Sequence, residues 1–256
     1  MKKLLIFNWK SNPHNAASAL KLARMVENII PTKKNFEVVI APPFLFLEDI
    51  GKVIKKATLG AQDAFWGDVG PYTGEISWHQ EKHLKVKYVI VGHSERRKFL
   101  NETDEIINKK VMAALKAGLK VILCVGENLS IRKRGKKAVE NFIKSQLQKD
   151  LNGLSRVNPP AGGQMSNVIV AYEPIWAIGT GHSDTPQDAV EMINFIKQSL
   201  KAKSYKLKAK VLYGGSVDGK NIKNFVQYKE IGGFLIGHAS LKQKEFGRII
   251  KTINNQ

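Results

Sequence analysis

The sequence has almost no cysteine: Cys124 is the only one among 256 residues. A single cysteine excludes a disulfide within the chain, and its place in the apolar run 121–125 predicts a buried, unreactive thiol. A chain of this length can bury enough apolar surface to fold without such cross-links. The absence of disulfides is typical of a reducing compartment, so we expect a cytoplasmic location.

Long hydrophobic runs are missing as well. No stretch approaches the roughly 20 apolar residues that a membrane-spanning helix needs. Lys2–Lys3 precede the apolar residues 4–7 as in a signal peptide, but Asn8 and the polar residues after it end that run too early. We therefore expect no membrane partner.

Acidic residues are scarce: the chain has 22 of them and 41 lysines and arginines, which gives a formal net charge of +19. The lysines are scattered, except for the dense tract 132–137 (Arg-Lys-Arg-Gly-Lys-Lys). Such a tract can mark a nucleic-acid site, but this one lacks the aromatic side chains that stack on bases. We interpret it as a solvated loop and helix start, expect no nucleic-acid partner, and note that a positive field attracts anionic substrates.

Short apolar runs alternate with helical segments along the whole chain. The runs that predict strands lie at 4–7, 38–40, 59–61, 88–91, 121–125, 168–172, 211–213 and 234–236. Helical spacing falls at 16–30, 44–56, 104–117, 138–151 and 186–201, with a short helix from 221 and a last one ending at 253. Continuous apolar strands of this kind are typical of parallel sheets that are covered on both faces.

This alternation predicts a closed (β/α)8 barrel in one domain over residues 1–256. The competing architecture is a doubly wound open sheet. The absence of a Gly-x-Gly-x-x-Gly motif after the first strand weakens that alternative and the dinucleotide site it would carry. No metal-ligand spacing is present either, so we expect neither a metal nor an organic cofactor.

The most informative stretch is 171–181 (Ala-Tyr-Glu-Pro-Ile-Trp-Ala-Ile-Gly-Thr-Gly), in which Glu173 directly follows a buried strand. Pro174 stiffens the exit from the strand, and the glycines after the apolar tip let the backbone turn freely. A carboxylate beside such a flap suits a base that is covered during reaction. The alternative is an exposed glutamate on a surface loop.

Residues at the carboxyl ends of barrel strands converge on one face. The predicted strands place Asn8 and Lys10 after the first, His93 and Glu95 after the fourth, and Glu173 after the sixth. One base, one neutral hydrogen-bond donor and one cation suit proton abstraction next to a carbonyl group. Each residue taken alone also has an ordinary structural or solvated role.

Glycine-rich turns follow the last two predicted strands. Gly214-Gly215-Ser216 and Gly237-His238 can present main-chain N–H groups to a phosphate, with Gly179 of the flap closing over it. We therefore expect substrate contacts from Asn8, Lys10, Gly179, Ser216, Gly237 and His238.

Four segments, in this order, resemble the triosephosphate isomerase family: Phe7-Asn8-Trp9-Lys10, residues 91–97 (Val-Gly-His-Ser-Glu-Arg-Arg), residues 171–181, and Tyr213-Gly214-Gly215-Ser216-Val217. Together they span nearly the whole chain. The resemblance implies a homodimeric barrel that interconverts dihydroxyacetone phosphate and D-glyceraldehyde 3-phosphate in glycolysis and gluconeogenesis.

The resemblance also implies residue roles. Glu173 moves the proton, His93 polarises the carbonyl as a neutral imidazole, Lys10 and Asn8 support the developing charge, and Glu95 orients Lys10. Two other interpretations remain open: a different phosphate-binding barrel enzyme, and a basic nucleic-acid-binding protein on a barrel scaffold.

One predicted connection, Ala64 to Ser77, is unusually long, and its part Phe65–Glu75 is rich in aromatic residues and glycine. It resembles the loop with which the family contacts its partner subunit, and Thr73 would then lie near the other active site. The alternative is a loop folded on its own barrel.

The chain departs from the family at two points near the site. The end of the flap reads His182-Ser183-Asp184 instead of Lys-Thr-Ala, and His238 replaces a glycine. We expect His238 to take an ordinary backbone conformation, to present its N–H to the phosphate, and to direct its imidazole along the mouth of the barrel.

Overall fold

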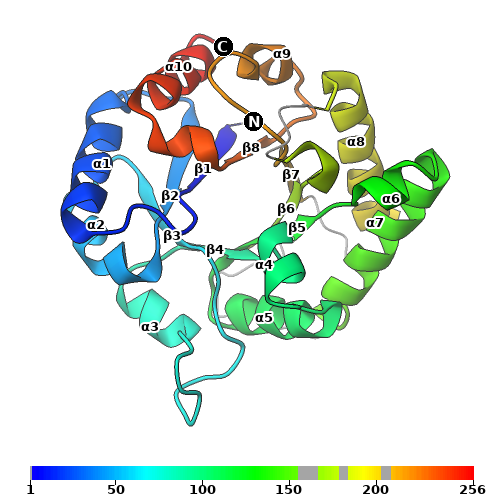
Figure 1. Ribbon diagram of the computed structural model, residues 1–256, viewed down its shortest axis with the longest axis horizontal. Helices are drawn as coiled ribbons and strands as arrows, with labels where there is room; N and C mark the ends of the chain where they lie inside the picture. Colours follow the sequence, from blue (N-terminus) through cyan, green and yellow to red (C-terminus); the bar gives the residue numbers. More distant parts are fainter. Residues whose placement is uncertain (1, 155–166, 179–183, 203–208) are drawn as a thin grey trace.

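The computed structural model describes residues 2–154, 167–178, 184–202 and 209–256. Eight strands pair in sequence order, all parallel, and β1 pairs with both β2 and β8, which closes the sheet into a barrel. Helices surround the ring of strands (Figure 1). The predicted (β/α)8 barrel is therefore confirmed, and the doubly wound open sheet is wrong.

The strands are β1 (Lys3–Asn8), β2 (Phe36–Ala41), β3 (Thr58–Ala61), β4 (Tyr88–Val91), β5 (Lys120–Val125), β6 (Val168–Tyr172), β7 (Lys210–Tyr213) and β8 (Gly233–Ile236). Every predicted strand agrees with its observed bounds within two residues.

The helices are α1 (Ala16–Ile29), α2 (Leu47–Val53), α3 (Trp78–His83), α4 (Ser94–Phe99), α5 (Asp104–Lys116), α6 (Leu129–Arg132), α7 (Lys136–Asp150), α8 (Pro186–Ala202), α9 (Ile222–Val226) and α10 (Gln243–Asn254). Short 3-10 turns lie at Phe44–Phe46, Ile175–Ala177 and His238–Leu241. Sequence reasoning missed α3 and α6, which are too short to show an apolar period; α3 is instead started by a capping box between Ser77 and Gln80.

In every strand except β3, the two faces enter two different cores. On β1, Leu4 and Ile6 belong to a cluster inside the barrel, and the residues between them pack outward against the helices. Both faces are buried, which is why the strands are continuously apolar. Asn8 continues the inward series of β1, and Glu173 follows Ala171 of β6 in the same way. The alternation therefore directs both polar side chains to the top of the interior.

Cys124 also lies inside the barrel, on β5, and is fully buried, as predicted. Burial, reinforced by the nearby charge of Glu173, raises the pKa of the thiol well above its ordinary value. The thiol therefore stays protonated. None of the helices in the described residues is both long and apolar enough to cross a membrane.

The predicted long connection after β3 folds as a structured loop that projects beyond the ring of helices beside α3 (Figure 1). A bridge between Phe65 and Ser77 closes its base. The Phe65 ring packs against Trp66 and Tyr72, with centroids 4.2 and 4.8 Å away. These aromatic contacts stiffen the loop.

The C-terminal face of the barrel carries balanced charge. We define it by the described segments from the last residue of each strand to the start of α1, α2, α3, α5, α7, α8, α9 or α10. Its nine cations are Lys10, Arg96, Arg97, Lys98, Arg132, Lys133, Arg134, Lys220 and Lys242. Its nine acids are Asp63, Asp68, Glu75, Glu95, Glu102, Glu127, Glu173, Asp184 and Asp218.

The N-terminal face is strongly cationic. It comprises the described segments that lead from a helix, or from residue 2, through the second residue of the next strand. These segments contain two acids, Glu37 and Glu230, and no arginine. They contain eleven lysines, here called the N-face lysines: Lys2, Lys3, Lys33, Lys34, Lys55, Lys56, Lys85, Lys87, Lys120, Lys210 and Lys229.

Candidate active site

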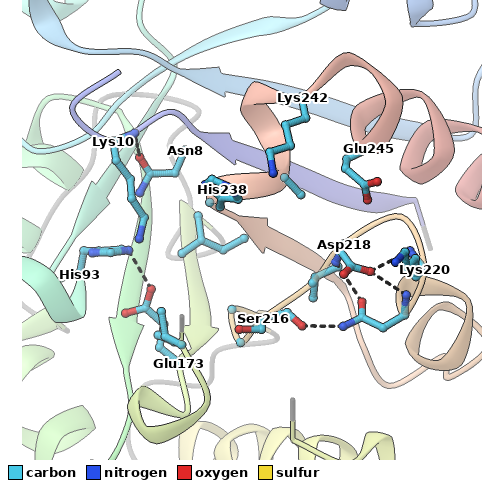
Figure 2. Close-up of a pocket in the computed structure, with 18 residues that line it drawn as sticks. Asn8, Lys10, His93, Glu173, Ser216, Asp218, Lys220, His238, Lys242 and Glu245 are labelled. Atoms are coloured by element: carbon cyan, nitrogen blue, oxygen red, sulfur yellow. Dashed lines mark hydrogen bonds and ion pairs between the residues drawn. The ribbon is translucent and has the colours of Figure 1, made fainter. Parts of the chain in front are cut away.

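A cavity of about 690 Å³ opens at the C-terminal face, above the barrel interior. Figure 2 shows its lining side chains converging from opposite sides of the barrel. The predicted site residues that line it are Asn8, Lys10, His93, Glu173, Ser216, Gly237 and His238. Glu95 is held against Lys10 at its edge, and Gly179 lies outside the described residues.

Glu173 is the buried carboxylate of this cavity, with only 2% of its surface exposed. One oxygen accepts a hydrogen bond from the main-chain N–H of Ser94 at 3.0 Å, and the other lies 3.2 Å from Nε2 of His93. The backbone N–H of Glu173 bonds to Val125 of the neighbouring strand, which fixes the origin of the side chain. The carboxylate thus has hydrogen-bond partners on the enzyme and faces the cavity.

His93 is the N-cap of α4, which determines which ring nitrogen carries the proton. Its Nδ1 accepts the main-chain N–H of Glu95 at 3.3 Å, so that nitrogen has no proton. The remaining nitrogen, Nε2, carries the proton and points toward Glu173. A helix N-terminus also disfavours a positive charge on the ring. His93 is therefore a neutral imidazole that donates from Nε2 into the cavity.

Lys10 has a left-handed backbone conformation, with φ of 53°, that a side chain rarely adopts. Two side chains hold it there: Oδ1 of Asn8 accepts its N–H at 2.9 Å, and the Gln62 amide donates to its carbonyl at 2.9 Å. Its ammonium group lies 2.5 Å from a carboxylate oxygen of Glu95. Strain retained in this way is typical of functional positions.

Two glycines leave room for these side chains. A Cβ on Gly214 would lie 3.0 Å from Cγ of Glu173, and a Cβ on Gly237 would lie 3.0 Å from Cε of Lys10. Any side chain at either position would press on the base or on the cation.

The opposite wall of the cavity comes from the turns after β7 and β8. The Ser216 hydroxyl donates to the carbonyl of Ala177, and the Asn221 amide donates to the carbonyl of Ser216. These bonds connect the turn after β7 to the segment that follows Glu173. His238 does not have a positive φ, as predicted, and its exposed side chain lines the mouth of the cavity (Figure 2).

The apolar segment after Glu173 is fastened at its described end. The indole N–H of Trp176 donates to Glu127 at 2.8 Å, and the Arg132 guanidinium lies over the indole ring, 4.9 Å from its centroid. Arg132 also lies 3.7 Å from Asp184, whose pKa burial raises to about 7. Of the unusual flap end, His182 and Ser183 lie outside the described residues.

The basic tract 132–137 contains the predicted loop and helix start, at the beginning of α7, but its first residue ends α6, a helix that was not predicted. Its members are not all solvated: Arg132 pairs with Asp188 at 3.0 Å, and Lys136 pairs with Glu191. Lys133 and Arg134 are exposed.

Sequence reasoning missed several residues in or beside the cavity. Gln62 does not line the cavity, but its amide donates to the Lys10 carbonyl. It directly follows β3, and this position is the signal that could have identified it. The polar residues Asp218, Lys220, Asn221, Lys242 and Glu245 form the outer wall. They lie on the turns after β7 and β8 or at the start of α10, so the same topological rule would have found most of them.

Among the described residues, no group of three or more histidine, cysteine or acidic side chains is arranged to hold a metal ion.

Comparison with known proteins identifies the family to which this chain belongs. The sequence profile of the family described as triosephosphate isomerase matches residues 3–253. The chain is 42% identical over 256 residues to the triosephosphate isomerase of Caldanaerobacter subterraneus subsp. tengcongensis, and 43% identical to that of Thermoanaerobacter pseudethanolicus. Each of these alignments covers 97% of this chain and 98% of the relative.

A more distant relative agrees. The triosephosphate isomerase of Dictyoglomus thermophilum is 39% identical over 259 residues, with 98% of this chain and 99% of that protein aligned. Profile, relatives and barrel all cover nearly the full chain. This chain belongs to the triosephosphate isomerase family.

Proposed function

We propose that Glu173, His93, Lys10 and Asn8 perform, in the cavity described above, the isomerisation that this chain catalyses as a member of its family. The reaction interconverts dihydroxyacetone phosphate and D-glyceraldehyde 3-phosphate. The observation that carries the assignment is the contact between the buried Glu173 carboxylate and the neutral His93 imidazole, 3.2 Å apart at the floor of one cavity.

Glu173 is the base in this proposal. Its carboxylate leaves the Ser94 N–H, takes a proton from one carbon of the substrate, and returns it to the adjacent carbon. The electron pair of the broken C–H bond forms a C=C bond between the two carbons, the π pair of the carbonyl moves onto its oxygen, and an enediolate results. Only 2% of the Glu173 surface is exposed, which favours proton transfer to substrate over exchange with solvent.

His93 and Lys10 act on the oxygen atoms. The Nε2–H of His93 donates to the carbonyl oxygen and to the oxyanion that replaces it, then moves that proton between the two oxygens. The Lys10 ammonium opposes the negative charge, and Asn8 fixes the Lys10 backbone. Glu95 is a positioning residue: it holds both the Lys10 ammonium and, through its N–H, the His93 ring.

The phosphate lies against the turns after β7 and β8 in this proposal, beside Ser216, Gly237 and His238. The flap residue Gly179 is proposed to close over it. A protonated His238 would add a charge-assisted contact to the phosphate.

The KM of the wild type and of His238→Gly, measured from about pH 5 to pH 8, tests the imidazole. A KM that decreases as the pH decreases, in the wild type but not in His238→Gly, supports a contact between the imidazole and the phosphate. Parallel curves remove the side chain from the phosphate site.

We also propose that the enzyme is a homodimer. Six of the seven exposed large apolar side chains in the described residues lie in the segments after the adjacent strands β2, β3 and β4: Phe44, Leu45, Val69, Tyr72, Phe99 and Leu100. The seventh is Leu129. One apolar face of this kind is typical of a subunit interface, and the Phe65–Glu75 loop projects from it. Thr73 at its tip is proposed to brace the partner's site.

Deletion of the loop tests the dimer. A variant with residues 67–74 replaced by a short glycine linker should elute as a monomer and keep little activity. Unchanged mass by light scattering would contradict the proposed interface.

Residues 1–256 are proposed to form one catalytic domain, because β1 and β8 close a single barrel. We propose a cytoplasmic location, where glycolysis and gluconeogenesis use these triose phosphates, and a reaction that needs no metal or organic cofactor. Dialysis against a chelator should leave turnover unchanged.

The direct test of function is a coupled assay on the purified protein, in which glyceraldehyde 3-phosphate is supplied and dihydroxyacetone phosphate is reduced by a second enzyme. Turnover that disappears in Glu173→Gln supports the assignment of both reaction and base. Full turnover in Glu173→Gln would reassign the base, and no turnover in the wild type would favour a different phosphate-binding barrel enzyme.

A further inference from the structure

We propose that the N-terminal face of the barrel binds the phosphate backbone of a double-stranded nucleic acid, independently of its sequence. The face lies at the opposite end of the strands from the catalytic cavity. It holds the eleven N-face lysines against two acidic residues, Glu37 and Glu230. A barrel end so dominated by one sign of charge attracts polyanions at long range.

The N-face lysines are not neutralised by ion pairs. Within the described part of the chain, no salt bridge involves any of them, whereas Lys10, Arg96, Arg97 and Arg132 of the C-terminal face all have carboxylate partners. The cationic charge of the N-terminal face is therefore available to a ligand.

Several ammonium groups are nevertheless held in place, by neutral acceptors. Lys3 donates to the carbonyls of Tyr228 and Ile231 at 2.8 and 2.7 Å, and Lys210 donates to the carbonyl of Lys2 at 2.7 Å. Main-chain carbonyls orient an ammonium group without cancelling its charge. The face is thus a partly preorganised array of cations.

The lysines repel one another. Burial lowers the pKa of Lys3 to about 8; the charge of Glu230 opposes this effect, and the charges of Lys197 and Lys210 add to it. Burial also lowers the pKa of Lys210, with Glu37 opposing the shift and Lys120 adding to it. A duplex carries cations condensed on its phosphates. Lysines that contact the phosphates displace these counterions, and their release is the main source of non-specific affinity for nucleic acids.

The chemistry of the face indicates what part of a nucleic acid it contacts. Bidentate recognition of bases uses arginine, and binding of single strands uses aromatic platforms. The described residues of the N-terminal face include no arginine, and all seven exposed large apolar side chains of the described residues lie at the C-terminal face. What remains is contact between lysines and phosphates, which suits the continuous backbone of a duplex.

The same absence disfavours a membrane. Stable attachment to a lipid surface takes a second signal, an inserted apolar group or a lipid chain, in addition to a basic patch. The described residues of this face supply no exposed apolar anchor. A duplex needs no such anchor, because phosphate contacts alone give measurable binding.

The test compares two variants that each lose three exposed cations. The first is Lys55→Gln/Lys87→Gln/Lys229→Gln on the N-terminal face, and the matched control is Lys133→Gln/Arg134→Gln/Lys137→Gln in the basic tract. Fluorescence anisotropy with a labelled mixed-sequence DNA duplex measures affinity from about 50 to about 200 mM salt. Isomerase activity shows that both variants fold, since neither set lines the catalytic cavity.

We expect the wild type to bind the duplex with an affinity that falls steeply with salt. The N-face variant should bind tenfold or more weakly at about 100 mM salt, with a log–log salt slope smaller by about three, whereas the control should stay within about twofold of the wild type. Equal losses in both variants overturn the proposal, as does an undetectable wild-type affinity at about 50 mM salt. Tighter binding to phosphatidylcholine vesicles containing phosphatidylserine than to the duplex would assign the face to a membrane instead.

Discussion

The two ends of this barrel are built on the same strands but treat charge in opposite ways. At the C-terminal face nine cations meet nine acids, and the charges nearest the chemistry are paired, as in Lys10 with Glu95. At the N-terminal face eleven lysines meet two acids, and several of the ammonium groups donate to main-chain carbonyls. The excess positive charge of the chain is therefore concentrated away from the reaction.

The difference between the two faces indicates the role of ion pairs in this protein. An ion pair holds a side chain in place, and a catalytic group that is misplaced by about an ångström is costly to the rate. Lysines without carboxylate partners repel one another, which weakens the fold. The barrel core tolerates both arrangements, because the strands contribute apolar side chains and the connections contribute the charge.

The largest difference between the ends should appear when the same change is made at both. Glu173→Asp shortens the base and should lower kcat by about a hundredfold or more with the fold intact, because an ångström of misplacement is costly in catalysis. Glu37→Asp, at the N-terminal face, should leave kcat unchanged. Steady-state kinetics with circular dichroism checks both, and near-normal turnover in folded Glu173→Asp would remove this residue from its role.

A second comparison uses two strained lysines, one at each end. Lys10 and Lys85 have positive φ values of 53° and 62°. Glycine relieves this strain, so Lys85→Gly should raise the free energy of unfolding by up to about 1 kcal/mol without changing activity. Lys10→Gly should gain less, since it loses the Glu95 partner, and should lose most turnover.

Urea unfolding and the coupled assay measure these outcomes. If Lys85→Gly impaired turnover as much as Lys10→Gly, strain at the C-terminal face would have no special connection with catalysis.

The two ends should also respond to different pH ranges with opposite signs. At the C-terminal face, burial raises the pKa of Asp184 to about 7, so between about pH 4 and 7 the folded protein holds a proton that the unfolded chain has released. Its contribution to stability is present at low pH and is lost as the pH rises through 7. Urea titrations measure the free energy of unfolding of the wild type and of Asp184→Asn at each pH. The difference between the two proteins should fall by an amount on the order of 2 kcal/mol as the pH rises.

At the N-terminal face the slope is reversed. Burial lowers the pKa of Lys3 from 10.5 to about 8, so between these values the unfolded chain binds the proton and the folded protein does not. Stability should rise with pH across this range in the wild type and should rise less in Lys3→Met, by about 1 kcal/mol. Equal slopes in the two proteins would show that the Lys3 ammonium is as well solvated after folding as before.

Much of this architecture could be predicted from the sequence, for a simple physical reason. Strands buried on both faces leave continuous apolar runs, and eight such runs alternating with helices have few compact solutions. The same topology predicts that Asn8, His93 and Glu173 converge on one face, and all three line the cavity. Family resemblance then supplied roles that spacing alone does not contain.

The remainder depended on tertiary contacts. Nothing in the residues around Gln62 indicates that its amide would hold the Lys10 carbonyl, because the partner lies 52 positions away. Arg132 belongs to a tract that looks solvated, yet it packs over Trp176. The charge asymmetry between the two faces, in contrast, could have been predicted. The N-face lysines precede predicted strands, and residues at the same end of parallel barrel strands share one face.

Cys124 is a natural probe for the opening of the barrel. The thiol is fully buried between the strands and is kept protonated by its surroundings, so reagents and oxidants cannot reach it in the folded barrel. Only separation of the strands exposes it, and it is the only thiol in the chain. The rate at which an alkylating reagent labels the protein therefore reports the opening of the barrel at a single site. A loss of barrel integrity would be recorded as a mass change on a single atom.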